Sequence, residues 1–452
     1  MKKVMTVVSA FAAFVSVFAA QVNRVLVRQQ WPWNADVRIE YDVSGLSNPA
    51  EVTFKFFDNE KEISVSDMNA IKGDRLYAKN GINVATFNPK ELFGPAAPAQ
   101  FTAFTAQVII GEENAKMGDK LYRIVDLDTG KVEDITRGDF YNGKYGAFVT
   151  DYKAINSGFS TEVEGDVFIW TDVTNNVAYR TSKMVLRKIP AANVEWMMGR
   201  SSAEYPTKLP ASQHLVKLTE DYYIGVFPVT QMQYFKLKGN YGKSFIDDKY
   251  ENHESYPVFG VAYETWRGKD VYWTVDGSNV ETESYLDVLR KKCGGTILFD
   301  MPTEAQWEFA CRGRNYTNPL YTGKSWTGSS LNEIAWSVSN SSVNEAFQPH
   351  VVGRKYPNVY GLYDMNGNMS EWCLDWAKEN TDYEWKSTAE PEVNPKGILK
   401  ENITLDQWGS GLHITRGASY NGDRTYCHSA YRACVSSSST GSVCMRVCCP
   451  AE

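Results

Sequence analysis

Residues 358–376 constrain the fold of this chain most, because they bring turn residues, oxygen donors and large aromatics together in nineteen positions. Gly361 and Gly367 permit positive φ, so the backbone can curl tightly and turn its carbonyl oxygens inward. Hard oxygen donors surround these glycines at the short, irregular spacing of a calcium loop: Asp364, Asn366, Asn368 and Glu371. The spacing is not that of an EF-hand. Two interpretations stay open, a calcium loop or an Asx-rich turn beside a tryptophan core.

The N-terminus has the pattern of a secretory leader. A basic start is followed by an apolar segment that ends at Phe18 and then by Ala19 and Ala20. This pattern predicts a signal peptide over residues 1–20, cleaved after one of the two alanines. A membrane anchor is the alternative, but the apolar run is shorter than a full span. We therefore expect an exported protein, periplasmic or extracellular, without a membrane span after cleavage.

Charge and cysteine distribution restrict the function further. A net charge of −7 without a concentrated basic run argues against a nucleic-acid binder. All eight cysteines lie in the C-terminal part: Cys293, Cys311, Cys373, Cys427, Cys434, Cys444, Cys448 and Cys449. In an exported protein this predicts disulfides in a second domain. Zinc is the competing interpretation, but C-x-x-C pairs with nearby histidines are missing.

The hydrophobic pattern divides the chain into regions. Residues 21–115 alternate apolar and polar over short runs, which predicts a β-sandwich of immunoglobulin or fibronectin III kind, serving as a spacer or partner-binding module. Residues 116–187 predict a β-rich connecting region. From 188 on, capping boxes begin helices at Thr230 and Thr303, and residues 280–293 also look helical. The sequence thus predicts an α+β domain with few, short helices.

Five fragments of the C-terminal region resemble one family in the family's order. They are residues 194–199 (VEWMMG), 223–231 (YIGVFPVTQ), 301–313 (MPTEAQWEFACRG), 361–376 (GLYDMNGNMSEWCLDW), and 416–420 (RGASY) followed by 430–432 (AYR). Together they resemble the formylglycine-generating enzymes, also called sulfatase-modifying factors, over about 188–452. The resemblance implies a C-type-lectin-like α+β fold. It also implies a disulfide from Cys311 to Cys448 or Cys449.

The family's calcium site implies an assignment for the loop described above. By resemblance, the side chains of Asp364 and Glu371 and the carbonyls of Gly367 and Met369 bind a structural calcium ion. Four oxygens in one tight turn leave little room for a substrate. A second calcium site is implied around residues 335–342, whose ligands the sequence does not assign.

The family's copper site is incomplete in this sequence. Active members hold Cu(I) with two cysteine thiolates five residues apart, which suits a soft ion. Here the second position is Cys427, but the first is Gly422, so the site cannot form as the family builds it. Ser419 and Tyr426 match the supporting catalytic residues. Candidate replacement donors are Cys434, Cys444 and His428.

Two functions follow from these observations. The first is a family oxidoreductase that converts a cysteine of a protein partner, such as a sulfatase, to formylglycine with O2, using Cys427 as the catalytic thiol. The second is a non-catalytic, lectin-like binding protein on the same fold. Other enzyme classes lack their motifs, since there is no Gly-x-Ser-x-Gly elbow and no phosphate-binding loop. Gly422 favours the binding protein.

Overall fold

The computed structural model describes the chain in twelve segments. They are residues 20–29, 35–98, 100–156, 166–199, 213–241, 253–269, 271–314, 329–343, 346–377, 390–403, 405 and 410–451. The predicted signal peptide lies outside them except for Ala20. The chain forms two compact units, Met1–Leu121 with Ile135–Ala147, and Tyr122–Asp134 with Phe148–Glu452. The expected connecting region, 116–187, is divided between the two units.

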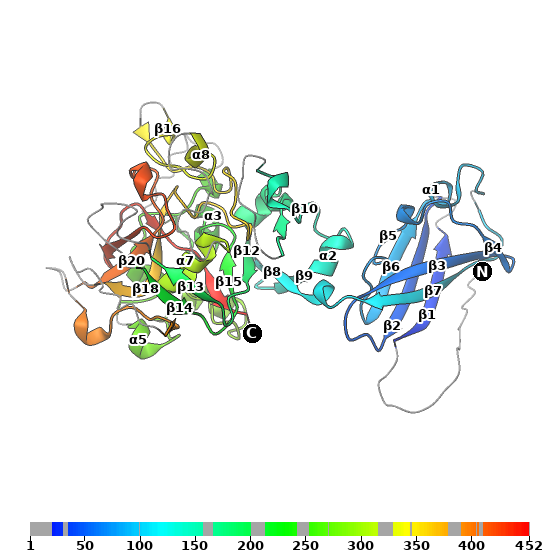
Figure 1. The fold of residues 1–452 in the computed structure, drawn as a ribbon, viewed down its shortest axis with the longest axis horizontal. Coiled ribbons are helices and arrows are strands. Elements are labelled where there is room, and N and C mark those ends of the chain that lie inside the picture. Colours follow the sequence, from blue (N-terminus) through cyan, green and yellow to red (C-terminus); the bar gives the residue numbers. More distant parts are fainter. Residues whose placement is uncertain are drawn as a thin grey trace. The chain divides into compact units, whose positions relative to one another are not determined.

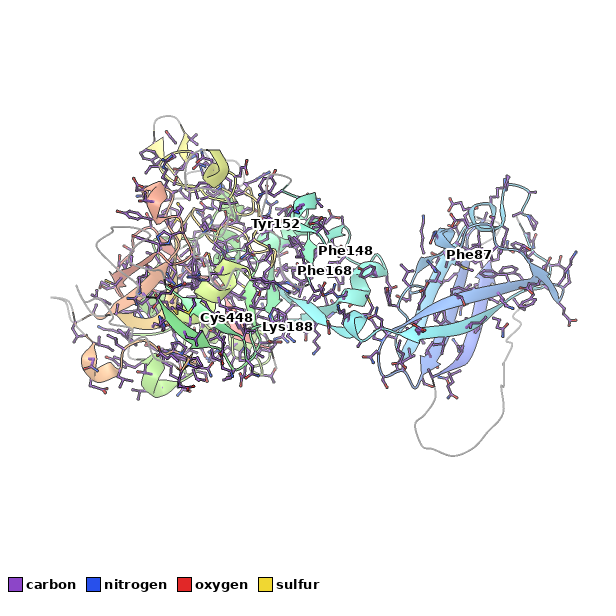
Figure 2. All side chains as sticks on the ribbon, viewed as in Figure 1. Phe87, Phe148, Tyr152, Phe168, Lys188 and Cys448 are labelled. Carbon is purple, nitrogen blue, oxygen red and sulfur yellow. The ribbon has the colours of Figure 1, made fainter. Side chains whose placement is uncertain are left out.

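The first unit contains two antiparallel sheets that share one core. One sheet has the order β1 (Gln21–Gln29), β2 (Val37–Ser44), β6 (Gly81–Phe87), β5 (Lys72–Gly73). The other has the order β4 (Lys61–Ile63), β3 (Ala50–Asp58), β7 (Phe104–Glu113). Burial alternates along β2 and β3, so each strand turns one apolar face inward, and Phe87 lies in this core (Figure 2). The expected all-β sandwich is confirmed. Its helices are α1 (Pro89–Phe93) and α2 (Arg137–Tyr141).

The second unit contains a five-stranded sheet, of which Figure 1 labels β8, β9, β12 and β15. Its order is β23 (Cys448–Pro450), β15 (Tyr222–Gly225), β12 (Lys183–Ile189), β8 (Lys120–Asp126), β9 (Val132–Thr136). Strand alternation sends neighbouring side chains to opposite faces, so Tyr223 belongs to one hydrophobic cluster and Tyr222 to another. This sheet therefore separates two cores.

The predicted helices lie over these cores. α3 (Gln231–Lys238) and α7 (Glu304–Arg312) begin at the expected capping boxes of Thr230 and Thr303, and α6 spans Tyr285–Lys292. The shorter ones are α4 (Tyr263–Trp266), α5 (Trp273–Asp276) and α8 (Ser329–Asn332). Among the described residues, no helix has the length and apolarity to span a bilayer. The expected α+β, C-type-lectin-like fold with few short helices is confirmed.

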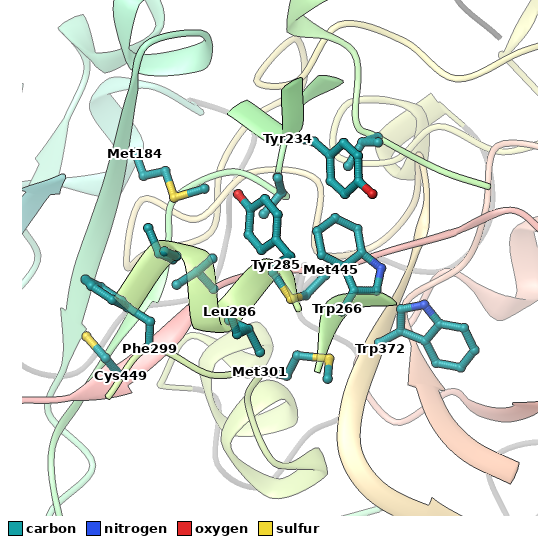
Figure 3. Packing of buried hydrophobic residues seen from close by; sticks show 14 of the residues in the cluster. Met184, Tyr234, Trp266, Tyr285, Leu286, Phe299, Met301, Trp372, Met445 and Cys449 are labelled. Carbon is teal, nitrogen blue, oxygen red and sulfur yellow. The ribbon is translucent and has the colours of Figure 1, made fainter. Parts of the chain in front are cut away.

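Aromatic packing fills the core between α3, α4 and α6. Tyr285 stacks on Tyr234 with ring centroids 5.5 Å apart and meets Trp266 edge-on at 4.8 Å (Figure 3). Such geometries add to the burial of large rings. Elsewhere in the same unit, Phe148 stacks on Phe168 at 4.6 Å (Figure 2).

A four-stranded sheet carries the central motif. Its order is β21 (Arg432–Ser436), β20 (Leu412–Arg416), β18 (Ser370–Ala377), β22 (Val443–Cys444). The remaining strands are β13 (Glu195–Met198), β14 (His214–Lys217), β19 (Glu392–Val393), β10 (Phe148–Val149), β11 (Ile169–Trp170), β16 (Ser342–Val343) and β17 (Ala346–Phe347). The second half of the motif is thus a buried strand, and its first half is a loop.

The expected disulfide from Cys311 is not formed. Cys311, Cys448 and Cys449 are all unbonded thiols. The Cys311 thiol donates to the carbonyl of Met365 at 3.8 Å, whereas Cys448 contacts the Gln306 side chain at 4.0 Å. Cys448 and Cys449 are neighbours on β23, so their side chains point to opposite faces of the sheet and lie in different cores. A bond between Cys311 and Cys449 would have to cross the sheet.

Candidate functional site

Three loops of the second unit are fixed to one another by backbone hydrogen bonds. The Asn368 N–H donates to Trp336 O at 3.0 Å, and the Tyr420 N–H donates to Asn368 O at 2.8 Å. The Asn368 side chain also bonds the backbone of His350 in both directions, at 2.9 and 3.0 Å. A Cβ on Gly367 would lie 2.4 Å from Trp336 O, so only glycine fits there. The central motif therefore serves as a rigid support for the loop of residues 417–427.

Asp364, a predicted calcium ligand, has one carboxylate oxygen that accepts no hydrogen bond from the described residues. Its backbone takes φ 60°, and its side chain is buried. Oδ2 accepts the Gly353 N–H at 2.8 Å, while Oδ1 has no hydrogen-bond partner among the described residues. Burial raises the pKa of Asp364 to about 6, although the Gly353 N–H and the Arg446 charge oppose the shift. This carboxylate is therefore poised to gain a proton or a cation.

Glu371, the other predicted carboxylate ligand, is already fully paired. Arg446 donates to its two oxygens at 2.7 and 3.0 Å, and Trp307 Nε1 donates to Oε2 at 2.7 Å. Glu371 and Arg446 are both buried. A cation would have to displace a buried arginine, at a cost that its own charge does not offset.

The Glu371 carboxylate is therefore occupied, whereas the Asp364 carboxylate keeps one oxygen without a partner among the described residues. The Gly367 carbonyl accepts the Met369 N–H at 3.0 Å, and the described residues contain no group of three acidic, histidine or cysteine side chains that could hold a metal ion. Metal binding is a property of this chain's relatives, but nothing in this loop selects the ion.

A buried charge network lies beside the motif, between α7 and the strands β20 and β21. Arg432 donates two hydrogen bonds to Glu304, at 2.7 and 2.9 Å, and Arg416 forms ion pairs with both Glu304 and Glu308. Arg312 donates from Nε to Glu308 at 2.8 Å. The i, i+4 spacing of Glu308 and Arg312 was the one readable signal. The network joins α7 to β20 and β21.

Asp375 contacts the same charge network through Glu304. Its Oδ2 accepts the Glu304 N–H at 2.6 Å, where the helix α7 begins. Burial and the nearby Glu304 charge raise the pKa of Asp375 to about 8. The pKa of Glu304 is lowered instead, because the charges of Arg432 and Arg416 outweigh the effect of burial. Asp375 thus holds a proton to much higher pH than Glu304 does.

Cys427 lies in an apolar environment. It is 2% exposed and belongs to a cluster with Tyr152, Ile169 and Val359. Burial raises the pKa of its thiol to about 12, and Asp423 adds to the shift. Asn366 donates to its backbone carbonyl at 3.4 Å, not to its sulfur. A thiol in such surroundings is inert, because the thiolate is the reactive and metal-binding form.

The other predicted catalytic residues lie on the same loop but make local contacts. The Ser419 hydroxyl bonds Asn421 Oδ1 at 2.6 Å. Tyr426 is 37% exposed and stacks on Tyr431 with centroids 4.6 Å apart. Gly422 donates its N–H to Ser419 O at 2.8 Å, and a Cβ there would meet the same oxygen at 3.2 Å. The loop therefore carries Ser419, Tyr426 and Cys427, but Gly422 leaves it without the first thiol.

Thiol reactivity should rank these cysteines by exposure. In the native protein we expect a disulfide reagent to label Cys434, which is exposed, well before Cys427, whose buried thiol is protonated. Peptide mapping after timed labelling measures the order. Urea should abolish the difference, and fast native labelling of Cys427 would contradict the buried, protonated state.

The fold and these loops define a C-type-lectin-like domain, and comparison with known proteins gives its family. Residues 174–448 match the family described as Sulfatase-modifying factor enzyme 1-like domain. The match covers more than half of the chain, so the chain belongs to this family.

Individual relatives are distant. The chaperone protein LppX of Paenibacillus barcinonensis is 28% identical over 185 residues, covering 34% of this chain and 62% of that protein. The formylglycine-generating enzyme of Streptomyces coelicolor is 32% identical over 153 residues, covering 31% of this chain and 41% of the enzyme. The chain therefore matches less than two thirds of the length of these relatives.

Solved structures resemble the chain only loosely. Treponema denticola variable protein 1 is 24% identical with a TM-score of 0.43, covering 59% of this chain and 95% of that one. PvdO from Pseudomonas aeruginosa is 18% identical with a TM-score of 0.42, covering 59% of this chain and 94% of that one.

Proposed function

We propose that this chain binds a protein partner through its sulfatase-modifying-factor domain without the family's copper-dependent oxidation. One observation carries the proposal: Gly422 replaces the first copper thiol, and the remaining Cys427 thiol is buried among apolar side chains. One protonated thiol holds Cu(I) poorly, because the soft ion needs thiolate donors. The domain therefore retains the family's fold but lacks the pair of thiolate donors that would hold copper.

The binding surface we infer lies over the loop of residues 417–427. Ser341, which precedes the hairpin of β16 and β17 (Figure 1), donates to Tyr420 O at 2.5 Å and so ties that hairpin to the loop. The hairpin exposes Phe347, and the loop exposes Tyr426. Aromatic side chains, phenylalanine and tyrosine among them, are enriched in protein interfaces. The family acts on protein substrates, which supports a protein as the partner.

Export and the identity of the partner belong to the same proposal. The basic and apolar start of the chain supports secretion, and a sulfatase is the partner that the family suggests. Formylglycine formation on such a partner is the competing function, and family membership supports it.

Copper binding distinguishes the two functions. We expect the reduced wild type to show no tight, one-to-one Cu(I) site in a competition titration with a chromophoric chelator. Gly422→Cys should create one, because it restores two thiols five residues apart, and Gly422 lacks positive φ. The new Cβ requires only a small shift of Ser419 O.

Matched variants exclude binding by other thiols. The gain in Gly422→Cys should disappear in Gly422→Cys/Cys427→Ser, which keeps every other cysteine. A tight site in the wild type that is lost in Cys427→Ser would mean that another residue replaces the missing thiol. That result would overturn the binding-protein proposal in favour of the oxidase.

A further inference from the structure

One face of the sheet β1–β2–β6–β5 in the first unit carries polar and charged side chains, while the other face packs in the core. Along β2, Val37 and Ile39 are buried, whereas Arg38 and Glu40 alternate with them and remain partly exposed. The strands of this sheet are antiparallel, and residues that are paired directly across neighbouring strands lie on the same face. The register therefore identifies the side chains that share the outer face with Arg38.

A row of cationic side chains crosses this outer face from one edge strand to the other. Arg28 on β1 is paired with Arg38 on β2. Thr86 on β6 is paired with Arg38 on one side and with Lys72 on β5 on the other. Because neighbouring strands lie about 4.8 Å apart, these four residues, the basic row, span about 14 Å. The basic row holds three cations and one hydroxyl, and it contains no carboxylate.

The carboxylates of this face lie in the two neighbouring rows. The register places Glu40 in the first of these rows and Asp42, opposite Arg24, in the second. Arg38 Nε donates to Glu40 at 3.3 Å, whereas Arg24 and Arg28 lie 3.9 and 3.8 Å from its oxygens, which is too far for hydrogen bonds. Three arginines thus share the charge of Glu40, and the three rows together hold four cations and two carboxylates.

The arginines of this face are accessible to a partner, and their arrangement favours an added anion. The side chains of Arg24 and Arg28 are 52% and 58% exposed, while that of Glu40 is 17% exposed. Arg28 opposite Arg38 is a like-charge cross-strand pair, which destabilises a sheet. A carboxylate placed between the two would remove this repulsion, because each guanidinium presents a planar fork of donors that fits a carboxylate.

We propose that the basic row binds an extended acidic segment of a protein partner. Every second side chain of an extended chain points to the same side, so carboxylates at positions i and i+4 lie about 13 Å apart. This separation matches the basic row: one carboxylate lies between Arg28 and Arg38, and the other reaches Lys72. The Thr86 hydroxyl between them can bond the backbone of the segment. The proposal concerns the first unit alone and does not depend on the copper site of the second.

Fluorescence anisotropy of the full chain with a labelled peptide tests this proposal. The probe is a peptide of about twelve residues in which Glu and Thr alternate, a pattern that places all carboxylates on one side of an extended chain. Low salt is used, because salt screens exposed charges. We expect Arg28→Gln/Arg38→Gln to weaken binding roughly tenfold, since it removes the cations at one end of the row. Glu40→Gln should tighten binding by about threefold, because it removes the carboxylate that competes for the same arginines.

Lys55→Gln/Lys61→Gln is the matched control. It also removes two exposed positive charges, but from the other sheet of the first unit, so the affinity should change by less than about twofold. A second peptide of the same composition, with all its Glu residues in one block, should bind more weakly than the alternating peptide. Equal binding of the two peptides overturns the proposal, as does unchanged binding in Arg28→Gln/Arg38→Gln.

Two further measurements complete the test. Vesicles of phosphatidylserine and phosphatidylcholine replace the peptide in a sedimentation assay. If the wild type binds these vesicles but not the alternating peptide, the basic row faces a lipid surface and the proposal is wrong. If Arg28→Gln/Arg38→Gln does not fold, Lys72→Gln at the other end of the row decides, since it should weaken peptide binding by roughly threefold.

Discussion

Arg446→Met is expected to destabilise the C-terminal unit by about 3–5 kcal/mol, because it leaves a buried carboxylate without its partner. Glu371 and Arg446 are both buried and joined by hydrogen bonds to both carboxylate oxygens. Arg446 also donates to the carbonyls of Gly225 and Tyr363, at 2.7 and 2.8 Å. Arg446 therefore connects β18 to the five-stranded sheet and also neutralises the charge of Glu371. Urea unfolding of the two proteins measures the difference.

A double variant separates the ion pair from the loss of packing. Glu371→Gln/Arg446→Met removes both charges and keeps similar volumes, so it should recover a large part of the stability lost in the single variant. The Glu371→Gln amide can still accept the Trp307 N–H. A loss below about 1 kcal/mol in Arg446→Met would mean that Glu371 is stabilised by something other than the arginine.

Local signals in the sequence predicted the elements of this fold well. The capping boxes at Thr230 and Thr303 depend on residues three positions apart, so both were readable and both are present. Apolar and polar residues alternate within each strand of residues 37–58, and this pattern was enough to predict strands with one buried face. Both features are local, so they can be recognised in the sequence without knowing which segment packs against them.

The site was harder to predict because its partners are distant in sequence. Glu371 presents only a carboxylate in the sequence, and the residue that neutralises it lies 75 positions away. The burial of Cys427 depends on side chains from separate segments, such as Tyr152 and Val359. The motif therefore identified the family, but whether a carboxylate serves a cation or an arginine could only be settled by the tertiary structure.

The pH dependence of stability should change most on replacing Asp375. Its pKa is raised from 3.8 to about 8 in the folded protein, so the stabilisation by the neutral acid is complete below about pH 4 and is lost as the pH rises through 8. Each pH unit between these limits should cost the wild type about 1.4 kcal/mol from this group. Asp375→Asn keeps an acceptor for the Glu304 N–H but cannot ionise.

We therefore expect the stability of Asp375→Asn relative to the wild type to increase steadily from pH 5 to pH 8. Urea unfolding at each pH measures this difference, in which groups common to both proteins cancel. Glu304 does not disturb it, because its lowered pKa keeps that residue ionised throughout. Asp364→Asn is the matched control: the pKa of Asp364 is only about 6, so its difference should stop changing above roughly that pH. A difference for Asp375→Asn that is constant with pH would show that Asp375 is ionised in the native protein, with the arginines of the network reaching it as well as Glu304.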